Sequence, residues 1–510
     1  MAYYLGIDVG TSGTKALIMD ARARVLATAT AEHGISAPRP GWSEQNPEEW
    51  WSATVKATRA VVSKARIDGK QVAGIGLSGQ MHGLVITDGA GNCLRPSIIW
   101  NDQRTAPQAA YIESAVGGRD KLIALVGNMA QTSFTLTKLL WVRDNEPAIY
   151  AKIRHLLLPK DYVRLRLTGE YAGEVSDMSG TLMLDQRTRN WSPEILSTFQ
   201  IDKSILPPVV ESHEITGRLT KEAAARLGLA AGTPVVGGGG DQPAGAVGNG
   251  VVADGLTSAT MGTSGVVFTH SKAYKTDPQS RVGTFCASVA GEWCMFGCVL
   301  SAGGSFQWFR NTLGAAEVAE AKKRKIDPYE LLTAQAAKAP AGCEGLFWLP
   351  YLTGERTPHS DPMARACWIG IHSRTTRNEL VRAVMEGATF AMNDVVQLLN
   401  GLGLRIKQIR LSGGGARSSF WRQLQADIYG ATCVTINAEE GAAYGVALLA
   451  AAGTGRFKDI REACKAGIKV VRTIRPKAKA RKQYAALYQQ YRRLYPALKA
   501  EFPRLAALSV

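Results

Sequence analysis

Short apolar runs alternate with amphipathic segments along most of the chain, a pattern that predicts strands separated by helices. The first three strand-like runs cover residues 4–9, 15–20 and 24–30, and a polar, glycine-rich turn joins the first two. A helix is predicted to begin after Asn46, because asparagine caps helix starts and Pro47 suits the first helical position. Later apolar runs predict further strands at residues 72–77, 84–87, 97–100, 233–236 and 409–411, and a pair of strands within 255–269. This alternation of strands and helices indicates an α/β fold.

The length of the chain and one short repeat indicate two halves. The sequence has 510 residues, more than one hydrophobic core normally supports, so two large domains are expected. The turn Gly10–Gly13 has the sequence Gly-Thr-Ser-Gly, which recurs at Gly262–Gly265, and each copy joins two strand-like runs. The shared setting predicts two similar halves, each with one phosphate-binding hairpin, that clamp a nucleotide between them.

Composition and charge narrow the class of protein. The net charge is +17, and the basic excess is densest between Lys469 and Lys482. No aromatic–basic recognition motif accompanies it, so we expect a solvated basic face and no nucleic-acid partner. No apolar run has the length of a membrane helix, and the N-terminus lacks an export signal, so no membrane association is expected. The eight cysteines form no CxxC pair, which predicts buried, reduced thiols and a cytoplasmic location.

Three glycine-rich turns offer backbone N–H groups and hydroxyls to an anion. The first contains Gly10, Thr11 and Ser12 and follows Asp8, an acid that can hold Mg²⁺ through water at the end of a strand. The other two turns contain Gly262, Thr263 and Ser264, and Gly413, Gly414 and Gly415. The spacing is not that of a P-loop. Polar turns without a ligand would have the same composition, so these residues alone leave both explanations open.

A single acid follows the longest run of glycines. Asp241 comes directly after Gly237–Gly240, at the end of a predicted strand and before a predicted helix. Open α/β sheets bind ligands at this edge, and phosphoryl transfer to an alcohol needs a carboxylate that accepts the hydroxyl proton. Asp241 suits that role. A helix-capping aspartate would occupy the same position, and the local sequence by itself favours the cap.

Two polar clusters at strand ends suggest a sugar site. Met81 and His82 follow the predicted strand 72–77, and they could contact the carbon chain and a hydroxyl of a sugar. Trp100 and Asn101 end another strand and supply a stacking surface and a hydroxyl-binding amide, the combination that sugar sites use. A lone histidine is more often a structural residue, so this cluster does not by itself identify a ligand.

Together these motifs resemble the FGGY family of carbohydrate kinases, in order and spacing and over nearly the whole chain. The segments that carry the resemblance are Gly6–Gly13, Trp42–Gln45, Gly79–Gly83, Leu94–Pro96, Trp100–Asp102, Leu158–Tyr162, Gly239–Asp241, Ala244–Gly248, Leu349–Leu352, Gly354–Pro358 and Gly413–Arg417. The resemblance implies two ribonuclease-H-like domains, of the kind also found in actin and heat-shock chaperones, flanking a deep cleft. It implies a sugar-binding domain at residues 1–250, which ends near the catalytic aspartate, and a nucleotide-binding domain at residues 251–510.

The resemblance also implies roles for the candidate residues. Asp241 is expected to accept the hydroxyl proton, Met81 and His82 to contact a ketose, and Asp8 to lie on the Mg²⁺ side of the nucleotide. Thr11, Ser12 and Thr263 are expected near the phosphates of ATP, and Gly413–Gly415 beside the nucleotide. Met81-His82 points to the branch that phosphorylates D-xylulose to D-xylulose 5-phosphate. Gln242 departs from the asparagine that often follows the aspartate in that branch, and glutamine also occurs there in kinases for other polyols.

Three alternative functions stay open at this point. A kinase of the same family could act on D-ribulose, a sugar alcohol or glycerol. A non-catalytic sugar-binding regulator would bind ligand without producing ADP, and the presence of both Asp8 and Asp241 argues against it, because such a module has no need of both. An actin-like or chaperone-like nucleotide switch would respond to a protein partner, and Met81-His82 disfavours it. The family resemblance also suggests a homodimer.

Overall fold

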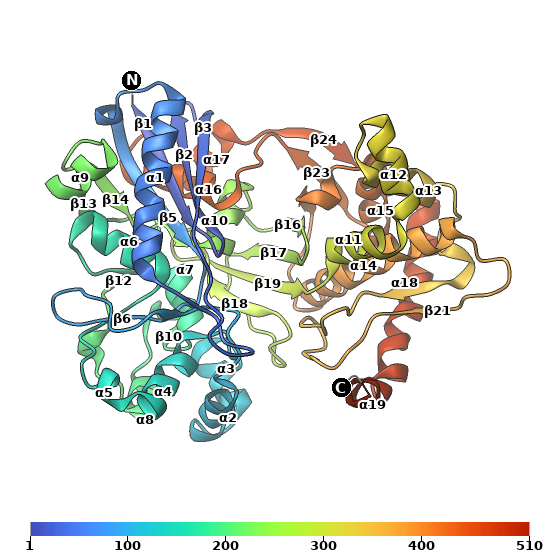
Figure 1. The fold of residues 1–510 in the computed structure, drawn as a ribbon, viewed down its shortest axis with the longest axis horizontal. Helices are drawn as coiled ribbons and strands as arrows, with labels where there is room; N and C mark the ends of the chain where they lie inside the picture. Colours follow the sequence, from blue (N-terminus) through green and yellow to red (C-terminus); the bar gives the residue numbers. More distant parts are fainter. Residues whose placement is uncertain (1, 509–510) are drawn as a thin grey trace.

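Two seven-stranded mixed sheets organise the structure, a computed structural model that describes residues 2–508 (Figure 1). In the first sheet the strand order is β13-β14-β5-β1-β2-β3, and β15 pairs with the end of β5. The strands of this sheet are β1 (Tyr3–Val9), β2 (Gly13–Asp20), β3 (Val25–Glu32), β5 (Val72–Gly79), β13 (Ile215–Arg218), β14 (Pro234–Val236) and β15 (Gly239–Gly240). These strands confirm the runs predicted near the N-terminus and before the glycine run.

The second sheet repeats the order of the central strands of the first. Its order is β18-β19-β17-β16-β22-β23-β24. In each sheet a central strand pairs antiparallel with the next strand along the chain, which pairs antiparallel with a third, and the other edge of the central strand pairs parallel. The strands are β16 (Leu256–Met261), β17 (Gly265–Ser271), β18 (Gly283–Cys286), β19 (Trp293–Val299), β22 (Gln408–Ser412), β23 (Thr432–Ile436) and β24 (Val470–Ile474). The prediction of two similar ribonuclease-H-like halves is therefore confirmed.

Helices cover both sheets. Helices α1, α6 and α9 pack on one face of the first sheet, and α11, α13, α14, α15 and α18 share a core with the second. Asn46 caps α1, as predicted, by accepting a hydrogen bond from the backbone N–H of Glu48. The bounds are α1 (Pro47–Ala65), α6 (Pro159–Thr168), α9 (Lys221–Leu227), α11 (Ala302–Leu313), α13 (Pro328–Ala336), α14 (Arg377–Gly401), α15 (Ser419–Tyr429) and α18 (Ala478–Leu498).

Most of the other elements form an outer region on the first half and short additions to the second. The helices are α2 (Ala106–Ala115), α3 (Arg119–Val126), α4 (Thr135–Asn145), α5 (Pro147–Tyr150), α7 (Val175–Met178), α8 (Pro193–Phe199), α12 (Ala315–Arg324) and α19 (Glu501–Ala507). The short paired strands are β4 (Glu44–Gln45), β6 (Val85–Thr87), β7 (Ser97–Ile98), β8 (His155–Leu157), β9 (Gly173–Glu174), β10 (Leu184–Asp185), β11 (Asn190–Trp191), β12 (Val209–Val210), β20 (Phe347–Leu349) and β21 (Cys367–Ile369).

A helix from the end of the chain completes the first sheet. Helix α16 (Gly441–Gly453) packs on β1 and β5 and crosses α10 (Asp241–Gly248), while α17 (Ile460–Gly467) packs beside it. A Cβ atom on Gly6 would lie 1.9 Å from the carbonyl oxygen of Ala443, and one on Gly76 would lie 2.0 Å from that of Val446. Because both sheet residues are glycines, the helix backbone rests directly on the sheet.

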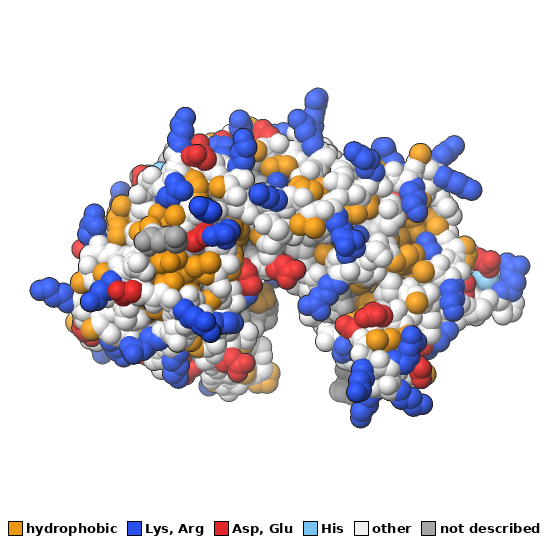
Figure 2. All heavy atoms as spheres, turned by 90° about the horizontal axis from the view of Figure 1, so that it is seen from above, with side chains coloured by type: hydrophobic (Ala, Val, Ile, Leu, Met, Phe, Trp, Pro, Cys, Tyr) orange, Lys and Arg blue, Asp and Glu red, His pale blue; other side chains and the backbone are white. Residues whose placement is uncertain are grey.

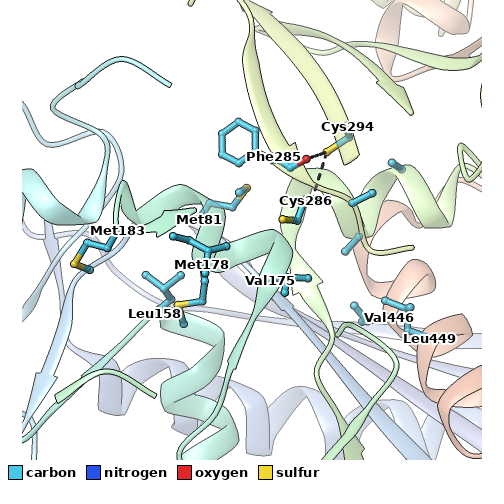
Figure 3. Packing of buried hydrophobic residues seen from close by; sticks show 14 of the residues in the cluster. Met81, Leu158, Val175, Met178, Met183, Phe285, Cys286, Cys294, Val446 and Leu449 are labelled. Atoms are coloured by element: carbon cyan, nitrogen blue, oxygen red, sulfur yellow. Dashed lines mark hydrogen bonds between the residues drawn. The ribbon is translucent and has the colours of Figure 1, made fainter. Parts of the chain in front are cut away.

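One buried cluster joins the two halves. Figure 3 shows part of it: Met81 and Val175 come from the first half, and Phe285, Cys286 and Val446 come from the second. Strand β18 is tied to the outer region of the first half, where the backbone N–H of Cys286 donates to Ser179 Oγ at 3.0 Å. Side chains that are far apart in the sequence thus form a single core shared by the two halves.

Four tyrosines near the C-terminus form a packed aromatic stripe. Tyr484, Tyr488, Tyr491 and Tyr495 lie on the buried face of α18. Three of their hydroxyls donate to buried or half-buried carboxylates: Tyr484 to Glu386 at 2.6 Å, Tyr488 to Asp394 at 2.5 Å, and Tyr495 to Asp361 at 2.8 Å.

The surface and the cysteines agree with the predictions from composition. The seven basic side chains at the end of the chain are exposed, and they are Lys469, Arg472, Arg475, Lys477, Lys479, Arg481 and Lys482. All eight cysteines are free thiols, five of them buried and three half-buried. No helix within residues 2–508 is both long enough and apolar enough to span a membrane.

Candidate active site

Two carboxylates meet where the central strands of the first sheet end. Asp8 on β1 is in register with Ser78 on β5, and Ser78 is also in register with Gly239 on β15. Asp241 follows two residues later as the first residue of α10. The sheet therefore places Asp8 and Asp241 on either side of the end of β5.

The surroundings of Asp241 suit proton transfer. Burial, followed by the negative charge of Asp8, raises the pKa of Asp241 to about 7, although hydrogen bonding to Gln242 acts in the opposite direction. Burial also raises the pKa of Asp8. The helix-capping role that the local sequence favoured for Asp241 is wrong, because Gly240 is the cap residue and Asp241 lies inside the helix. The side chain of Asp241 therefore does not cap the helix.

The residues predicted to contact a ketose lie beside Asp241. A Cβ atom on Gly240, the residue before Asp241, would lie 2.8 Å from Met81 Cγ. Met81 is buried, and its side chain thus packs against the backbone that leads into the aspartate. His82 comes next in the chain and remains half-buried. The structure brings Met81, His82, Asp241 and Gln242 together at one end of the sheet.

The ring of His82 is fixed from three sides. Its Nδ1 lies 2.9 Å from the carbonyl oxygen of Gly180, in the turn after α7. Phe134 packs edge-on at 4.9 Å between ring centroids, and Phe285 lies at 6.2 Å. Burial, and next the positive charge of Lys138, lowers the pKa of His82 to about 3. His82 is therefore a neutral imidazole at physiological pH.

The first glycine-rich turn lies at the same end of the sheet as Asp8. The backbone N–H of Gly10 donates to the carbonyl oxygen of Gly13 at 3.0 Å, which closes the turn and leaves Thr11 and Ser12 at its tip. Trp100 donates from its indole N–H to Thr11 Oγ1 at 2.9 Å. Trp100, which was predicted to stack on a sugar, therefore contacts the turn that was predicted to bind phosphate. Asn101 beside it is exposed. The predicted roles of both in sugar binding stay predictions.

The other two turns meet in the second lobe. A cavity of about 750 Å³ is lined by Gly262 and Thr263 from the β16–β17 turn and by Gly414 and Gly415 from the turn after β22. Aromatic and polar side chains complete its wall, among them Phe306, Asp327, Tyr329, Arg417, Phe420 and Trp421. This volume and this mixture of glycine backbone and aromatic side chains suit a nucleotide.

Two residues predicted to bind phosphate, Gly413 and Ser264, do not line this cavity. Gly413 adopts φ +77°, and a Cβ atom there would lie 2.6 Å from the carbonyl oxygen of Met261, so this glycine is needed for a close turn. Ser264 lies at the end of the β16–β17 turn, where its carbonyl oxygen accepts the N–H of Gly262 at 2.9 Å. Neither residue is part of the cavity lining, and the predicted phosphate contacts of both stay predictions.

The two sets of residues lie on lobes that face each other. Figure 2 shows the surface hollowed between the lobes. The first lobe contributes the carboxylates of Asp8 and Asp241 and the residues predicted to contact a ketose. The second lobe contributes the cavity with its glycine turns. Such an arrangement can hold an alcohol near a base on one side and a nucleotide on the other.

Sequence reasoning missed several residues of these sites. Phe285 packs on His82 from a strand about 200 residues away in the chain, and no local pattern reveals such a contact. Tyr329 and Asp327 reach the cavity from the start of α13, again far from any glycine turn. Phe420 could have been found, because the helix that follows Gly413–Gly415 must begin at the same wall.

Comparison with known proteins agrees with this geometry. Residues 3–248 match the N-terminal domain of the FGGY family of carbohydrate kinases, and residues 257–454 match its C-terminal domain. A xylulose kinase of Bacillus subtilis is 37% identical over 495 residues, which cover 97% of each chain. A crystal structure of a xylulose kinase from Brucella ovis is 37% identical with a TM-score of 0.89, and covers 98% of this chain and 99% of that one.

A gluconate kinase from Lactobacillus acidophilus has a similar structure as well. It superposes with a TM-score of 0.92 at 26% identity, and 99% of each chain is covered. The protein described here belongs to the FGGY family of carbohydrate kinases. Membership in this family makes it an ATP-dependent carbohydrate kinase. Since relatives with the same fold act on different acceptors, the acceptor has to be argued from the site.

Proposed function

We propose that the protein transfers the γ-phosphoryl group of ATP to D-xylulose and forms D-xylulose 5-phosphate and ADP. The observation that carries the proposal is the position of Asp241 beside Met81 and His82 in the first lobe, while the cavity that suits a nucleotide lies in the second lobe. Full-length similarity to proteins named xylulose kinase supports the choice of acceptor.

In the proposed reaction Asp241 accepts the proton of the attacking hydroxyl. The 5-hydroxyl oxygen forms a bond to the γ-phosphorus as the bond between that phosphorus and the bridging oxygen of ADP breaks. A carboxylate with a pKa of about 7 is poised for this role near neutral pH, because it is a stronger base than an ordinary aspartate. The lobes must approach each other so that the phosphoryl group reaches the sugar and water is excluded.

A Mg²⁺ ion fits this site as a companion of the nucleotide. Asp8 Oδ1 is buried and has no hydrogen-bond partner among the described residues, so a carboxylate oxygen is free for the ion or for its water. Residues 2–508 contain no group of three or more acidic, histidine or cysteine side chains that could hold a metal by themselves. We infer that phosphate oxygens and Asp8 would hold the ion together, and that the ion would neutralise charge on the phosphates.

Replacement of Asp241 by asparagine tests the proposal. The Asp241→Asn variant should bind ATP nearly as well as the original protein, yet its turnover should fall by about 10³-fold or more, because the proton acceptor is lost. Turnover is measured as ADP release with D-xylulose, and nucleotide binding by calorimetry. Exchange of Asp254, an exposed acid in the loop before β16, for asparagine provides the control. Near-normal turnover of Asp241→Asn would refute the role of this residue.

The acceptor itself is tested with a substrate panel. D-xylulose should be phosphorylated with the highest kcat/KM among D-xylulose, D-ribulose, glycerol, sugar alcohols and gluconate. Gln242 is the residue that could favour another polyol as the acceptor. Its amide reaches one methylene further than the asparagine common in the xylulose branch, which would change how hydroxyls are recognised. A preference for another member of the panel would keep the enzyme a carbohydrate kinase and change its substrate.

The remaining expectations add to this proposal without deciding it. The free state of all eight cysteines supports a reducing compartment such as the cytoplasm. The domain boundary at residue 250 and the homodimer stay predictions. We propose the first lobe as the sugar-binding half and the second as the nucleotide-binding half, in line with where the two groups of candidate residues lie.

A further inference from the structure

The backbone of His82 has an unusual conformation that two neighbouring side chains hold in place. His82 adopts φ +71°, in the left-handed region that favours glycine. Its carbonyl oxygen accepts hydrogen bonds from Lys138 Nζ at 2.7 Å and from Thr135 Oγ1 at 3.1 Å. Both donors are on α4, one helical turn apart, so this helix fixes the backbone carbonyl of His82 in the candidate sugar site.

Lys138 has an environment that packing alone does not explain. Its side chain is fully buried, and within residues 2–508 no carboxylate forms an ion pair with it. The ammonium group instead donates to two backbone carbonyls, those of His82 and Ser133. Burial lowers the pKa of Lys138 to about 7. A buried lysine without a carboxylate is costly, which indicates that the hydrogen bonds it makes are needed.

The contacts of the His82 ring determine what it can offer a ligand. The carbonyl oxygen of Gly180 can only accept, so Nδ1 of His82 must carry a hydrogen atom. The charged groups that act on the ring, Lys138 and Arg356, are both cations and keep it neutral. In a neutral imidazole with a proton on Nδ1, Nε2 carries a lone pair. The ring therefore presents a hydrogen-bond acceptor at Nε2.

We propose that Lys138 is a positioning residue. Its hydrogen bond to the His82 carbonyl orients the His82 ring so that Nε2 accepts a hydrogen bond from a hydroxyl of the sugar. The inference deepens the proposed function and rests on it. It also defines a preference. A hydroxyl group can donate to Nε2, whereas a carboxylate or phosphate of an anionic acceptor cannot, so a neutral polyhydroxylated substrate is favoured at this position.

The protonation pattern of the ring can be measured in the unmodified protein. Nitrogen-15 NMR of protein labelled at histidine distinguishes the two neutral tautomers, and His82→Asn identifies the signals of His82 among the seven histidines. We expect the Nδ1–H tautomer, and we expect the ring to remain neutral on titration from pH 8 to about pH 5. An Nε2–H tautomer, or a titration near the ordinary histidine pKa, would overturn the proposal. This measurement needs no enzyme activity.

Kinetics test the role of Lys138. Lys138→Met removes the donor and keeps the length of the side chain, while Thr135→Val removes the second donor to the same carbonyl with little change of shape. Both variants should raise the KM for sugar, by about tenfold for Lys138→Met, and leave the KM for ATP unchanged. Lys56→Met, at an exposed position of α1, is the matched control.

The outcomes separate the two proposals. A raised KM for sugar together with a shifted His82 tautomer in the variants would support positioning by Lys138. A lower thermal midpoint with an unchanged KM for sugar would show a merely structural role and refute it. If Lys138→Met does not fold, Thr135→Val and the tautomer of the unmodified protein still decide. If the unmodified protein phosphorylates no sugar, the proposed function fails, and calorimetric binding of D-xylulose to both variants replaces KM as the test.

Discussion

Asp8 and Asp241 lie on either side of the end of β5, and the negative charge of Asp8 adds to burial in raising the pKa of Asp241 to about 7. Two carboxylates that share one end of a sheet cannot both ionise as easily as they would in water. This relationship makes Asp241 a base whose protonation changes within the physiological range, and it gives the activity a defined dependence on pH.

The first prediction concerns that pH dependence. Only deprotonated Asp241 can accept the hydroxyl proton, so kcat/KM for the sugar should fall as the pH drops below about 7 and reach a plateau above it. Nucleotide-bound Mg²⁺ near Asp8 would move the midpoint towards lower pH, because a cation favours the carboxylate. The measurement is the pH profile of kcat/KM at saturating Mg–ATP. A profile that is flat between pH 5 and pH 8 would contradict the assignment of the base.

The second prediction concerns the contact between Gly180 and His82. A Cβ atom on Gly180 would lie 2.5 Å from His82 Nδ1, so Gly180→Ala should displace the ring and raise the KM for sugar by about tenfold. The KM for ATP should not change, because the nucleotide-type cavity is in the other lobe. Gly401→Ala, at the end of α14, is the matched control, because an added Cβ atom there would meet no neighbouring atom within 4 Å. Equal effects on both substrates would point to a general loss of folding.

The third prediction concerns the crossing of α10 and α16. A Cβ atom on Gly445 would lie 1.9 Å from the carbonyl oxygen of Ala244, so Gly445→Ala must push the two helices apart. The free energy of unfolding should fall by about 1–3 kcal/mol, as for other overpacked sites. Gly245→Ala, in the same pair of helices, meets no atom closer than 4.0 Å. That control should be neutral or slightly stabilising, because alanine favours helices more than glycine. Denaturant unfolding of both variants provides the comparison.

The fourth prediction concerns the cavity of the second lobe. Ala334 lines it from α13, and the Ala334→Trp side chain would fill part of its 750 Å³. The KM for ATP should rise by about tenfold or more while the KM for sugar stays unchanged. Ala316→Trp, at an exposed position of α12 that is not part of the lining, controls for the added ring. An unchanged affinity for ATP would exclude this cavity as the nucleotide site.

Much of this architecture could be predicted because it depends on short-range patterns. The strands β1, which contains Asp8, and β14, which comes before Asp241, are compact apolar runs followed by glycines, and Asn46 and Pro47 mark the start of α1 without any tertiary context. The repeated Gly-Thr-Ser-Gly turn also reflected a real repeat, since the two sheets share the order of their central strands. The FGGY resemblance then connected segments that periodicity alone could not join.

The remaining features depend on contacts between distant segments. Lys138 is an ordinary helical residue in the sequence, and only the fold shows that it grips the His82 carbonyl. Local composition favoured a capping role for Asp241, but a residue's place at a helix start depends on the backbone of the preceding glycines. Trp100 was expected to stack on a sugar, and the structure ties its indole to Thr11.

The seating of α16 on the first sheet has a consequence for synthesis on the ribosome. The glycine-lined face of β1 and β5 is made early, yet the helix that covers it begins only at Gly441. During most of translation that face is uncovered, so the nascent first lobe cannot complete its core until nearly the entire polypeptide has emerged. Until then its apolar surface is accessible to chaperones and prone to aggregation. Shortened products that stop before this helix should therefore be rapidly degraded.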